Sequence, residues 1–474
     1  MNPVAIIGGG ITGLTAAFRL RERGVPVTLY ESGPRVGGVI QTVRQDGYLA
    51  ECGPNTLLET SPRIGELIRD AGLEDQLLYS DPGAGKRFLV RRGQPVPLPG
   101  SPAAFLFTRL FSLGAKLRLL REPFIRPGDP DADESVAAFV RRRLGQEFLD
   151  YAINPLVAGI YAGDPALLSV KHAFPKLHAL EQRYRSLIRG QILGARERGR
   201  RAEVSKQNAR KISFRTGLQA LPDALHARLS DVARLSAPVT GLARNEDGWM
   251  ITVRSGDEEE VTVHPAVVFA APAYRLAGLK LAGIPQRPLR SVSMIPYPPV
   301  ASVVLGFRRE DVVHPLDGFG MLIPEIERFN ILGTLFSSSL FPSRAPEGCV
   351  TLSSYVGGTR APDLALESPD ELVRLTLDDL RHLLGVRGEP TFRHTFVFPR
   401  AIPQYNVGFG QCKELMDRTE MESPGLFLAG HYREGISLSD SIVSGDNVTK
   451  RVCSYLEVGR TGLESESTLA TFAA

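Results

Sequence analysis

The order of apolar and polar positions at the start of the chain predicts a strand, a helix and a second strand. A short apolar run occupies residues 4–7, and a second apolar run ends on Tyr30. Between them Leu14, Phe18 and Leu20 recur at helical spacing. Two strands joined by a helix form a parallel pair, so we expect a β-α-β unit here.

The rest of the chain predicts further strands and helices in two groups. Amphipathic helices are expected over residues 61–78, 214–229 and 369–384. Strands are expected over residues 239–242, 249–253, 261–263, 267–270, 300–307 and 350–356. Near the C-terminus, residues 425–430 predict a buried strand that enters a glycine turn, and residues 435–445 predict a turn that opens a helix. The strands 300–307 and 350–356, with the helix 369–384, indicate a separate mixed sheet.

A glycine-rich turn, Gly8-Gly9-Gly10-Ile11-Thr12-Gly13, joins the first strand to the first helix. Gly8 permits a tight turn, Gly10 lets the backbone approach a pyrophosphate, and Gly13 lets helix and strand pack closely. The helix N-terminus offers N–H groups and partial positive charge to phosphates. Glu31 lies about 20 residues on, where a carboxylate accepts hydrogen bonds from ribose hydroxyls. Together these features predict a dinucleotide site.

Composition narrows the classes of protein. The chain has 474 residues, 43% of them hydrophobic, and a formal net charge of +4. This length predicts about two or three domains, and the charge is too small to indicate nucleic acid as a partner. Cys52, Cys349, Cys412 and Cys453 are far apart, so we expect free thiols, and no cysteine or histidine spacing indicates a metal site. No signal peptide or transmembrane helix is expected.

Two stretches have unusual patterns. Residues 105–122 combine phenylalanine and leucine with four basic residues and one acid. This pattern suits a helix in a membrane interface, and equally a core helix whose cations lie at its rim. Residues 183–215 are basic and interrupted by glycine, which favours a solvated connection over a nucleic-acid site.

The second strand leads into Glu31-Ser32-Gly33-Pro34-Arg35-Val36-Gly37-Gly38, which resembles the second cofactor motif of glutathione-reductase-type FAD proteins. Residues 425–430 and 435–445 resemble the other half of that site, in which a helix N-terminus faces the flavin and stabilises negative charge on the reduced ring. Motifs at opposite ends of the chain imply a sheet closed by non-local pairing, and they favour FAD over NAD.

Internal motifs resemble those of the oxygen-dependent, FAD-containing protoporphyrinogen oxidase family. Residues 153–165 resemble its NP-x-x-x-GVYAGDP signature, and residues 51–55 resemble its E-x-GPN loop. Residues 332–338 and Pro403-Gln404-Tyr405 match it as well. The resemblance extends from Val4 to about Val452, and it is closer to the plant-type enzymes than to the Gram-positive coproporphyrinogen oxidases.

The resemblance implies an α/β fold with three parts. A Rossmann-like FAD-binding domain of the glutathione-reductase type would comprise residues 1–85, 208–275 and 420–457. A mixed-sheet substrate domain would comprise residues 86–90 and 276–419. An α-helical, membrane-associating domain would comprise residues 91–207, and residues 458–474 would form a loose tail.

The family's cofactor contacts carry over to matching positions. Beyond the glycine turn and Glu31, they are Ser32, Arg35, Gly37, Gly38, Val39, Gly53, Pro54, Asn55, Thr56, Val239, Gly430, His431, Ile436, Ser437 and Leu438. Phe409 lies one place from the position at which the family often has an aromatic residue after the Pro-Gln-Tyr element, so the match gives it no flavin contact.

The implied substrate contacts are fewer. Arg87 would bind a propionate, Gly159 would let a flat macrocycle lie close, and Leu332 would clamp one ring face. Tyr355 or Val356 would face Leu332 from the next strand. No catalytic side chain is expected, because the flavin carries the chemistry.

The implied activity is the oxidation of protoporphyrinogen IX to protoporphyrin IX by successive two-electron steps with O2, in heme and chlorophyll biosynthesis. Coproporphyrinogen III stays open as the substrate, as do another FAD oxidase or desaturase reaction and a non-catalytic protein-binding role. An amine oxidase needs an aromatic cage and a lysine near the flavin, and neither is evident. We expect a cytoplasmic protein attached peripherally to the inner face of the cell membrane, with no nucleic-acid partner. A homodimer is left open.

Overall fold

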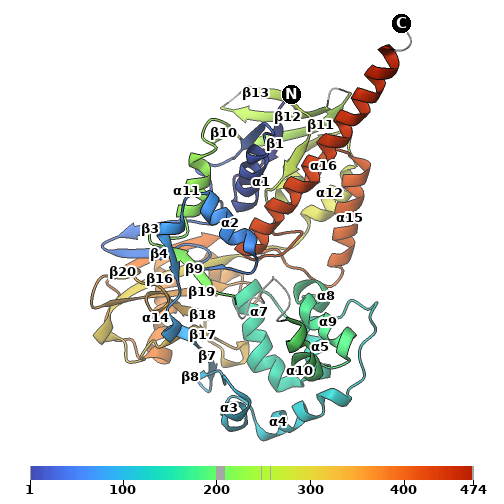
Figure 1. The fold of residues 1–474 in the computed structure, drawn as a ribbon. Helices are drawn as coiled ribbons and strands as arrows, with labels where there is room; N and C mark the ends of the chain where they lie inside the picture. Colours follow the sequence, from blue (N-terminus) through green and yellow to red (C-terminus); the bar gives the residue numbers. More distant parts are fainter. Residues whose placement is uncertain (1, 199–208, 247, 257, 472–474) are drawn as a thin grey trace.

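The computed structural model describes residues 2–198, 209–246, 248–256 and 258–471, built around a five-stranded sheet (Figure 1). Neighbouring strands of this sheet are all parallel. In spatial order they are β10 (Ala233–Arg234), β2 (Val27–Tyr30), β1 (Val4–Ile7), β14 (Val267–Phe269) and β21 (Leu426–Leu428). The first strand thus pairs with one from mid-chain, which pairs with one near the C-terminus. The expected non-local closure is confirmed.

Helices α1 (Ile11–Glu22) and α16 (Leu438–Thr471) lie side by side on one face of this sheet (Figure 1). Leu14 of α1 and Val448 of α16 are buried in one core with Val4 and Ile6. Residues 458–474 were expected to be loose, but α16 continues as far as Thr471. No proline follows Leu438 to end the helix.

A second sheet packs on the other face of the parallel sheet. Its strands are β13 (Glu258–His264), β12 (Gly248–Ser255), β11 (Val239–Asn245) and β15 (Lys280–Ala282). Trp249 and Ile251 share a core with Ala5 and Ile7 of β1. Because β15 pairs with β11, this unit reaches past residue 275, where the sequence placed its boundary.

The expected mixed sheet has seven strands and is covered on one face by α14 (Pro369–Leu384). In spatial order the strands are β20 (Phe392–Phe398), β16 (Val300–Arg308), β19 (Cys349–Gly357), β18 (Ile331–Phe336), β17 (Gly318–Leu322), β7 (Lys86–Arg91) and β8 (Gln94–Pro97). Only the β17–β7 pair is parallel among these described strands. β8 carries Pro95 and Pro97 at the sheet edge, where proline is tolerated, and it extends the sheet beyond residue 90.

Helices dominate the segment between β8 and residue 198. They are α3 (Pro102–Phe107), α4 (Leu113–Leu120), α5 (Val136–Arg143), α6 (Gln146–Phe148), a π-helical turn (Leu149–Ile153), α7 (Asn154–Tyr161), α8 (Val170–Ala173), α9 (Pro175–Tyr184) and α10 (Leu187–Arg198). The basic stretch 183–215 is therefore partly helical, and its residues 199–208 lie outside the described residues.

Residues 105–122 form two short helices rather than one. Ser112 begins α4 by accepting a hydrogen bond from the backbone N–H of Ala115 at 3.2 Å. Between the helices Leu110 and Phe111 are buried, and Phe111 stacks on Phe148 with ring centroids 4.2 Å apart. These contacts divide the segment into a buried joint and two exposed helices.

Small elements complete the chain. β3 (Thr42–Gln45) pairs with β4 (Tyr48–Glu51), and β9 (Lys211–Phe214) lies between β5 (Leu57–Leu58) and β6 (Leu77–Tyr79). The remaining described α-helices are α2 (Pro62–Asp70), α11 (Ala220–Ala227), α12 (Gln286–Ser293), α13 (Ser337–Leu340) and α15 (Phe409–Glu422), and 3-10 helices of three to six residues lie between elements.

Candidate functional site

The first glycine turn is closed on the protein side and open over Gly10. Gly8 has φ of 110°, and an added Cβ there would lie 2.9 Å from the backbone nitrogen of Ala271. A Cβ on Gly13 would lie 1.9 Å from the carbonyl oxygen of Gly8, whereas a Cβ on Gly10 would meet nothing within 4 Å. Gly10 gives α1 no side-chain cap, and the first turn, which begins at Ile11, holds no acid. The N–H groups of this turn can therefore face an anion.

Glu31 is fixed beside this turn. Its Oε2 accepts a hydrogen bond from the backbone N–H of Gly9 at 2.7 Å, and its Oε1 accepts one from Gly33 at 2.7 Å. The Ser32 hydroxyl also donates to Oε1, at 3.2 Å. A carboxylate has about four acceptor sites, so capacity remains for hydroxyl donors of a ligand.

The second glycine loop abuts the first. The N–H of Gly37 donates to the carbonyl of Gly9 at 2.8 Å. The Arg35 guanidinium donates to the carbonyl of Gly38 at 2.7 Å. Arg35 therefore holds the loop in place, and Val39, which follows it, is 45% exposed.

The C-terminal glycine turn meets the N-terminal one. An added Cβ on Gly430, whose φ is 116°, would lie 3.7 Å from the hydroxyl of Thr12. Thr12 donates that hydroxyl to the carbonyl of Ser441 in α16 at 3.0 Å. Thr12 thus joins α1 to α16, and the two ends of the chain build one site.

Ser437 and Asp440 cap the start of α16 reciprocally. The N–H of Ser437 donates to Asp440 Oδ2 at 3.1 Å, and the N–H of Asp440 donates to Ser437 Oγ at 3.2 Å. The Asp440 carboxylate offsets part of the positive charge that the family resemblance places at this helix end. Ile436 and Leu438, on either side of Ser437, are half-buried.

The loop of residues 53–56, which includes Pro54 and Thr56, is attached to the mixed sheet. Tyr355 of β19 donates its hydroxyl to the carbonyl of Gly53 at 3.1 Å and accepts a hydrogen bond from the Asn55 amide. Ser337 donates to Asn55 Oδ1 at 3.4 Å. An added Cβ on Gly53 would lie 2.3 Å from the carbonyl oxygen of Val39. This loop therefore connects the second glycine loop to the sheet.

The segment that leads into Val239 is hydrogen-bonded to residues 31–33. The N–H groups of Ser236 and Ala237, just before it, donate to the carbonyls of Gly33 and Glu31, each at 2.8 Å. The half-buried Val239 side chain is thereby held near the turn that begins at Glu31.

His431 is the most unusual polar group of the site. Its Nε2 is buried and has no hydrogen-bond partner among the described residues, and its ring lies 5.7 Å from that of Tyr297. Burial lowers the pKa of His431 to about 4, so the imidazole is neutral at physiological pH. Its carbonyl accepts a hydrogen bond from the Tyr405 hydroxyl, which in turn accepts one from the N–H of Gly435 at 2.9 Å. Tyr405 was matched only as part of a motif, and no sequence signal gave it this bridging role.

Phe409 does not reach the site. Its ring stacks on that of Tyr405 with centroids 4.1 Å apart, and the side chain is 4% exposed.

The predicted substrate residues divide between the two faces of the mixed sheet. Leu332 packs with Ala158 of α7 and with Tyr355. An added Cβ on Gly159 would lie 2.5 Å from Leu322 Cδ2, so this glycine lets α7 pack closely on β17. Val356 is wholly buried on the opposite face, in the core beneath α14. The alternative Val356 is therefore wrong, because successive side chains of a strand point to opposite faces.

Arg87 lies on the face of Leu322. Its β7 position is in register with Gly320, and Leu89 is in register with Leu322. Its side chain is exposed, and its guanidinium carbon lies 5.8 Å from the ring centroid of Phe319. It is therefore free to meet a carboxylate.

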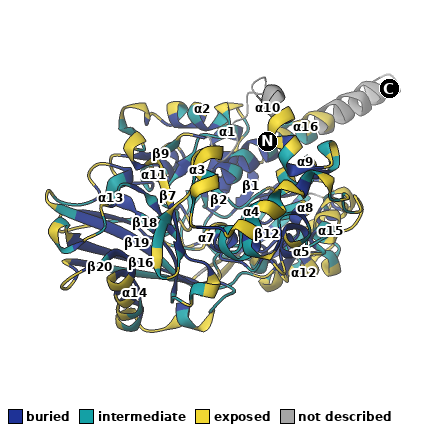
Figure 2. Cartoon of the chain, turned by 90° about the horizontal axis from the view of Figure 1, so that it is seen from below, coloured by how far each residue is buried: buried dark blue, intermediate teal, exposed yellow. Residues whose placement is uncertain are grey.

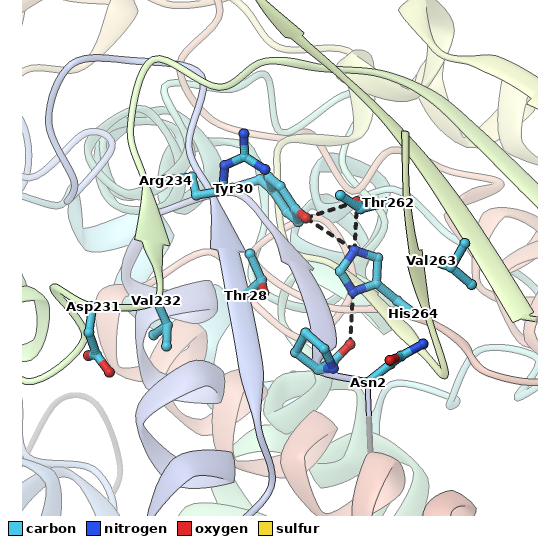
Figure 3. Close-up of a pocket in the computed structure, with 10 residues that line it drawn as sticks. Asn2, Thr28, Tyr30, Asp231, Val232, Arg234, Thr262, Val263 and His264 are labelled. Carbon is cyan, nitrogen blue, oxygen red and sulfur yellow. Dashed lines mark hydrogen bonds between the residues drawn. The ribbon is translucent and has the colours of Figure 1, made fainter. Parts of the chain in front are cut away.

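A separate pocket of about 550 Å³ lies along β2, β10 and β13 (Figure 3). It is lined by Asn2 and Pro3, which precede β1, and by Tyr30 and His264. Tyr30 and His264 hydrogen-bond to each other at 3.1 Å, and His264 Nδ1 lies 2.8 Å from the carbonyl of Pro3. None of the residues that line it belongs to the glycine turns.

Metal sites and membrane-spanning helices are both absent from the described residues. No group of three or more His, Cys, Asp or Glu side chains there could hold a metal ion. None of the described helices is long and apolar enough to cross a membrane. The four cysteines are free.

The geometry fits FAD. The open space over Gly10, the fixed Glu31 carboxylate and the unpartnered His431 Nε2 all belong to segments that meet around the first glycine turn. The phosphates would lie at the turn, the ribose at Glu31, and the flavin toward the C-terminal turn and Tyr355.

Comparisons with known proteins agree with this reading. A family model described as flavin containing amine oxidoreductase matches residues 11–453. Protoporphyrinogen oxidase 2 of Arabidopsis thaliana is 36% identical over 96% of this chain and 94% of its own. Coproporphyrinogen III oxidase of Bacillus subtilis is 32% identical over 96% of this chain and 98% of its own.

Solved structures share the fold. A protein from Exiguobacterium sp. 255-15, described as a candidate protoporphyrinogen oxidase, has a TM-score of 0.81 at 25% identity and covers 96% of this chain and 99% of its own. A putrescine oxidase bound to putrescine has a TM-score of 0.67 at 16% identity over 96% of this chain and 99% of its own, which shows the shared fold alone.

Proposed function

The chain belongs to the family of flavin-containing amine oxidoreductases, with FAD as its cofactor, and from this premise we propose that it oxidises protoporphyrinogen IX to protoporphyrin IX. The relatives named protoporphyrinogen oxidase support this substrate, since the chain covers nearly their whole length at 36% identity.

The observation that carries the proposal is one face of the mixed sheet. On this face apolar Leu332 and Leu322 pack against α7 beside the half-buried Tyr355, and the neighbouring strand β7 carries an exposed cation, Arg87. A porphyrinogen has the matching chemistry, because it is a broad apolar macrocycle with propionate groups at its rim. Tyr355 also holds the loop of residues 53–56, so the substrate face is joined to the cofactor site.

When bound, FAD supplies two-electron oxidation at N5. Removing six hydrogens from the porphyrinogen takes three such steps, and with O2 as acceptor three molecules of O2 become three of H2O2. The chain's own residues bind and orient the macrocycle: Arg87 through a carboxylate, and Leu332 through a ring face. His431, held neutral by burial, adds no charge beside the flavin.

Coproporphyrinogen III is the second candidate substrate. The relative from Bacillus subtilis that bears this activity in its name is 32% identical and is covered over 98% of its length. Both substrates carry propionates on a macrocycle, so they share the contacts with Arg87 and Leu332.

We also propose that the chain rests on a membrane through α3, α4 and the turn that follows them. Much of α3 and α4 is exposed (Figure 2). Exposed apolar side chains of this segment are Leu106, Phe107, Leu113, Leu117, Leu120 and Phe124, and Phe107 is 85% exposed. Arg109, Arg118 and Arg121 are exposed cations of the same segment. An exposed apolar patch rimmed by cations suits the interface of an anionic bilayer. The protein would then be cytoplasmic and peripheral on the inner face of the cell membrane.

We propose that the chain divides into an FAD-binding part, a substrate part and a helical part. The FAD-binding part comprises the parallel sheet with its two covering layers, the substrate part comprises the seven-stranded sheet with α14, and the helical part comprises α3 to α10.

The decisive experiment is an assay of the purified FAD-loaded protein with protoporphyrinogen IX and coproporphyrinogen III, monitored by porphyrin fluorescence, O2 uptake and H2O2 formation. We expect three H2O2 for each porphyrin, with a higher kcat/KM for protoporphyrinogen IX. A higher kcat/KM for coproporphyrinogen III would select the second candidate, and no porphyrin from either would refute a porphyrinogen oxidase.

A further inference from the structure

Two cations from different sheets converge on one aromatic ring. Arg87 of β7 places its guanidinium carbon 5.8 Å from the ring centroid of Phe319, and Lys211 of β9 places its Nζ 5.7 Å from the same centroid. Phe319 lies at the irregularity between Gly318 and Gly320 of β17. A ring attracts cations to its face, but it does not neutralise two of them.

Neither cation has an acidic partner among the residues that the structure describes. The acids nearby are already paired, since Asp317 pairs with Lys86 and Glu59 pairs with Arg210. Lys211 is half-buried, and burial together with the charge of Arg87 lowers the pKa of Lys211. A half-buried lysine beside a second cation is unfavourable in isolation and becomes favourable when an anion binds.

The two cations lie where the cofactor loop meets the substrate face. Lys211 is in register with Leu58 of β5. The strand β5 begins directly after Thr56, the last residue of the loop of residues 53–56. Arg87 belongs to the face that carries Leu322, whereas its neighbour Phe88 points into the core beneath α14. A carboxylate between β7 and β9 would therefore belong to a molecule lying on the substrate face.

We propose that Lys211 is a second carboxylate anchor for the substrate, and that Lys211 and Arg87 each bind one of two neighbouring propionates. This inference rests on the proposed function and deepens it, because it fixes which edge of the macrocycle lies at β7 and β9. Lys211 falls in the basic stretch that the sequence assigned to a solvated connection, and only its pairing in β9 brings it to Arg87.

The test compares a porphyrinogen that has free propionates with its dimethyl ester. Lys211→Met should raise KM for the free acid about three- to tenfold, as expected for loss of a partly exposed charged hydrogen bond, and should leave kcat within about twofold. With the ester the same variant should match the wild type. Lys211→Arg should restore most of the KM, because it keeps the charge. Lys280→Met, at a side chain that is 78% exposed and paired with Glu259, is the matched control.

The Arg87→Ala, Lys211→Met double variant tests whether the two cations bind two different carboxylates or share one. Separate carboxylates predict that the two KM effects multiply, whereas a shared carboxylate predicts a smaller product and would overturn the two-propionate assignment. If the ratio of the KM for the free acid to the KM for the ester is the same in Lys211→Met as in the wild type, Lys211 is not part of the site. The proposed function would be unaffected by that result. Binding of the porphyrin product and of its ester, followed by fluorescence, repeats the comparison without turnover. If the wild type oxidises no porphyrinogen, the proposed function is wrong. If Lys211→Met then also binds the porphyrin and its ester as tightly as the wild type does, the inference about Lys211 is wrong as well.

Discussion

Glu31 Oε2 accepts a hydrogen bond of 2.7 Å from the backbone N–H of Gly9, so the acid at the end of β2 fixes the turn that follows β1. The same carboxylate accepts from Gly33 through its other oxygen. One side chain therefore fixes the first glycine turn to the end of β2. Under the proposed function the same carboxylate would also bind the ribose of FAD.

We predict that Glu31→Ala weakens FAD retention more than it slows oxidation by the flavin-loaded fraction. A charge-assisted hydrogen bond contributes about 1.5–3 kcal/mol, which is roughly a ten- to 150-fold rise in the Kd for FAD. Titration of apoprotein with FAD, followed by flavin fluorescence, measures this. Glu22→Ala, at the exposed end of α1, should bind FAD like the wild type. Equal affinity in Glu31→Ala would take Glu31 out of the cofactor site.

Arg87→Ala should raise KM for a porphyrinogen and change kcat less, because a contact remote from the reacting carbon binds substrate and transition state alike. Arg87→Lys should recover part of the loss, since an ammonium keeps the charge but lacks the guanidinium fork. The measurement is steady-state kinetics by porphyrin fluorescence. Arg374→Ala, on the outer surface of α14, is the control. Unchanged kinetics for Arg87→Ala would mean that Arg87 is only a surface residue.

The sequence predicted the cofactor half of the molecule well, because its signals are local. Gly8 and Gly13 leave no room for a side chain, whereas Gly10 faces open space, and the apolar run before them predicts the buried strand. Two motifs at opposite ends of the chain predicted a sheet closed by non-local pairing, and the pairs of β1 with β14 and of β14 with β21 close it.

The substrate half depended on contacts that no local pattern encodes. Tyr355 and Val356 both suit a strand, and only the pairing with β18, irregular between Ile331 and Gly333, decides which one shares a face with Leu332. Residues 105–122 carry a helical pattern, but Leu110 and Phe111 turn inward because Phe148 offers a stacking partner. Tertiary packing decided both cases.

His431 should make stability depend on pH. Burial lowers its pKa from 6.5 to about 4, so between these values the unfolded chain binds a proton that the folded chain does not. This contribution to stability is therefore complete above pH 6.5 and is lost as the pH falls toward 4. Linkage gives a loss of about 2 kcal/mol at pH 5 relative to pH 7.5.

Urea unfolding of the FAD-loaded protein at these two pH values measures the difference. His431→Asn should reduce the difference by about that amount, and the exposed His382→Asn should leave it unchanged. A difference that persists in His431→Asn would show that other groups cause the acid sensitivity.

Glu122 and Arg143 form a fully buried ion pair with Nη1 and Oε1 3.2 Å apart. Glu122 also accepts hydrogen bonds from the backbone N–H groups of Leu187 and Ile188, and so attaches the start of α10 to the turn after α4. Glu122→Ala leaves Arg143 with Glu181 as its remaining acidic partner and strands the N–H groups of Leu187 and Ile188, so it should cost about 1–3 kcal/mol. The double variant Glu122→Leu, Arg143→Met should be more stable than Glu122→Ala. Thermal unfolding followed by circular dichroism tests this order, and the reverse order would contradict it.

The exposed and buried phenylalanines of residues 105–124 should respond differently to the same substitution. Phe107→Ser and Phe124→Ser remove side chains that are 85% and 82% exposed, so they should lower binding to anionic vesicles without lowering Tm. Phe111→Ser removes the stack on Phe148 and should cost about 3–5 kcal/mol of stability, as large-to-small changes in a core do. Each of the exposed arginines near the bilayer should add about 1 kcal/mol, so binding should fall as salt rises. Co-sedimentation with vesicles of increasing anionic lipid measures both effects. Wild-type protein that stays in the supernatant at low salt would rule out attachment through this segment.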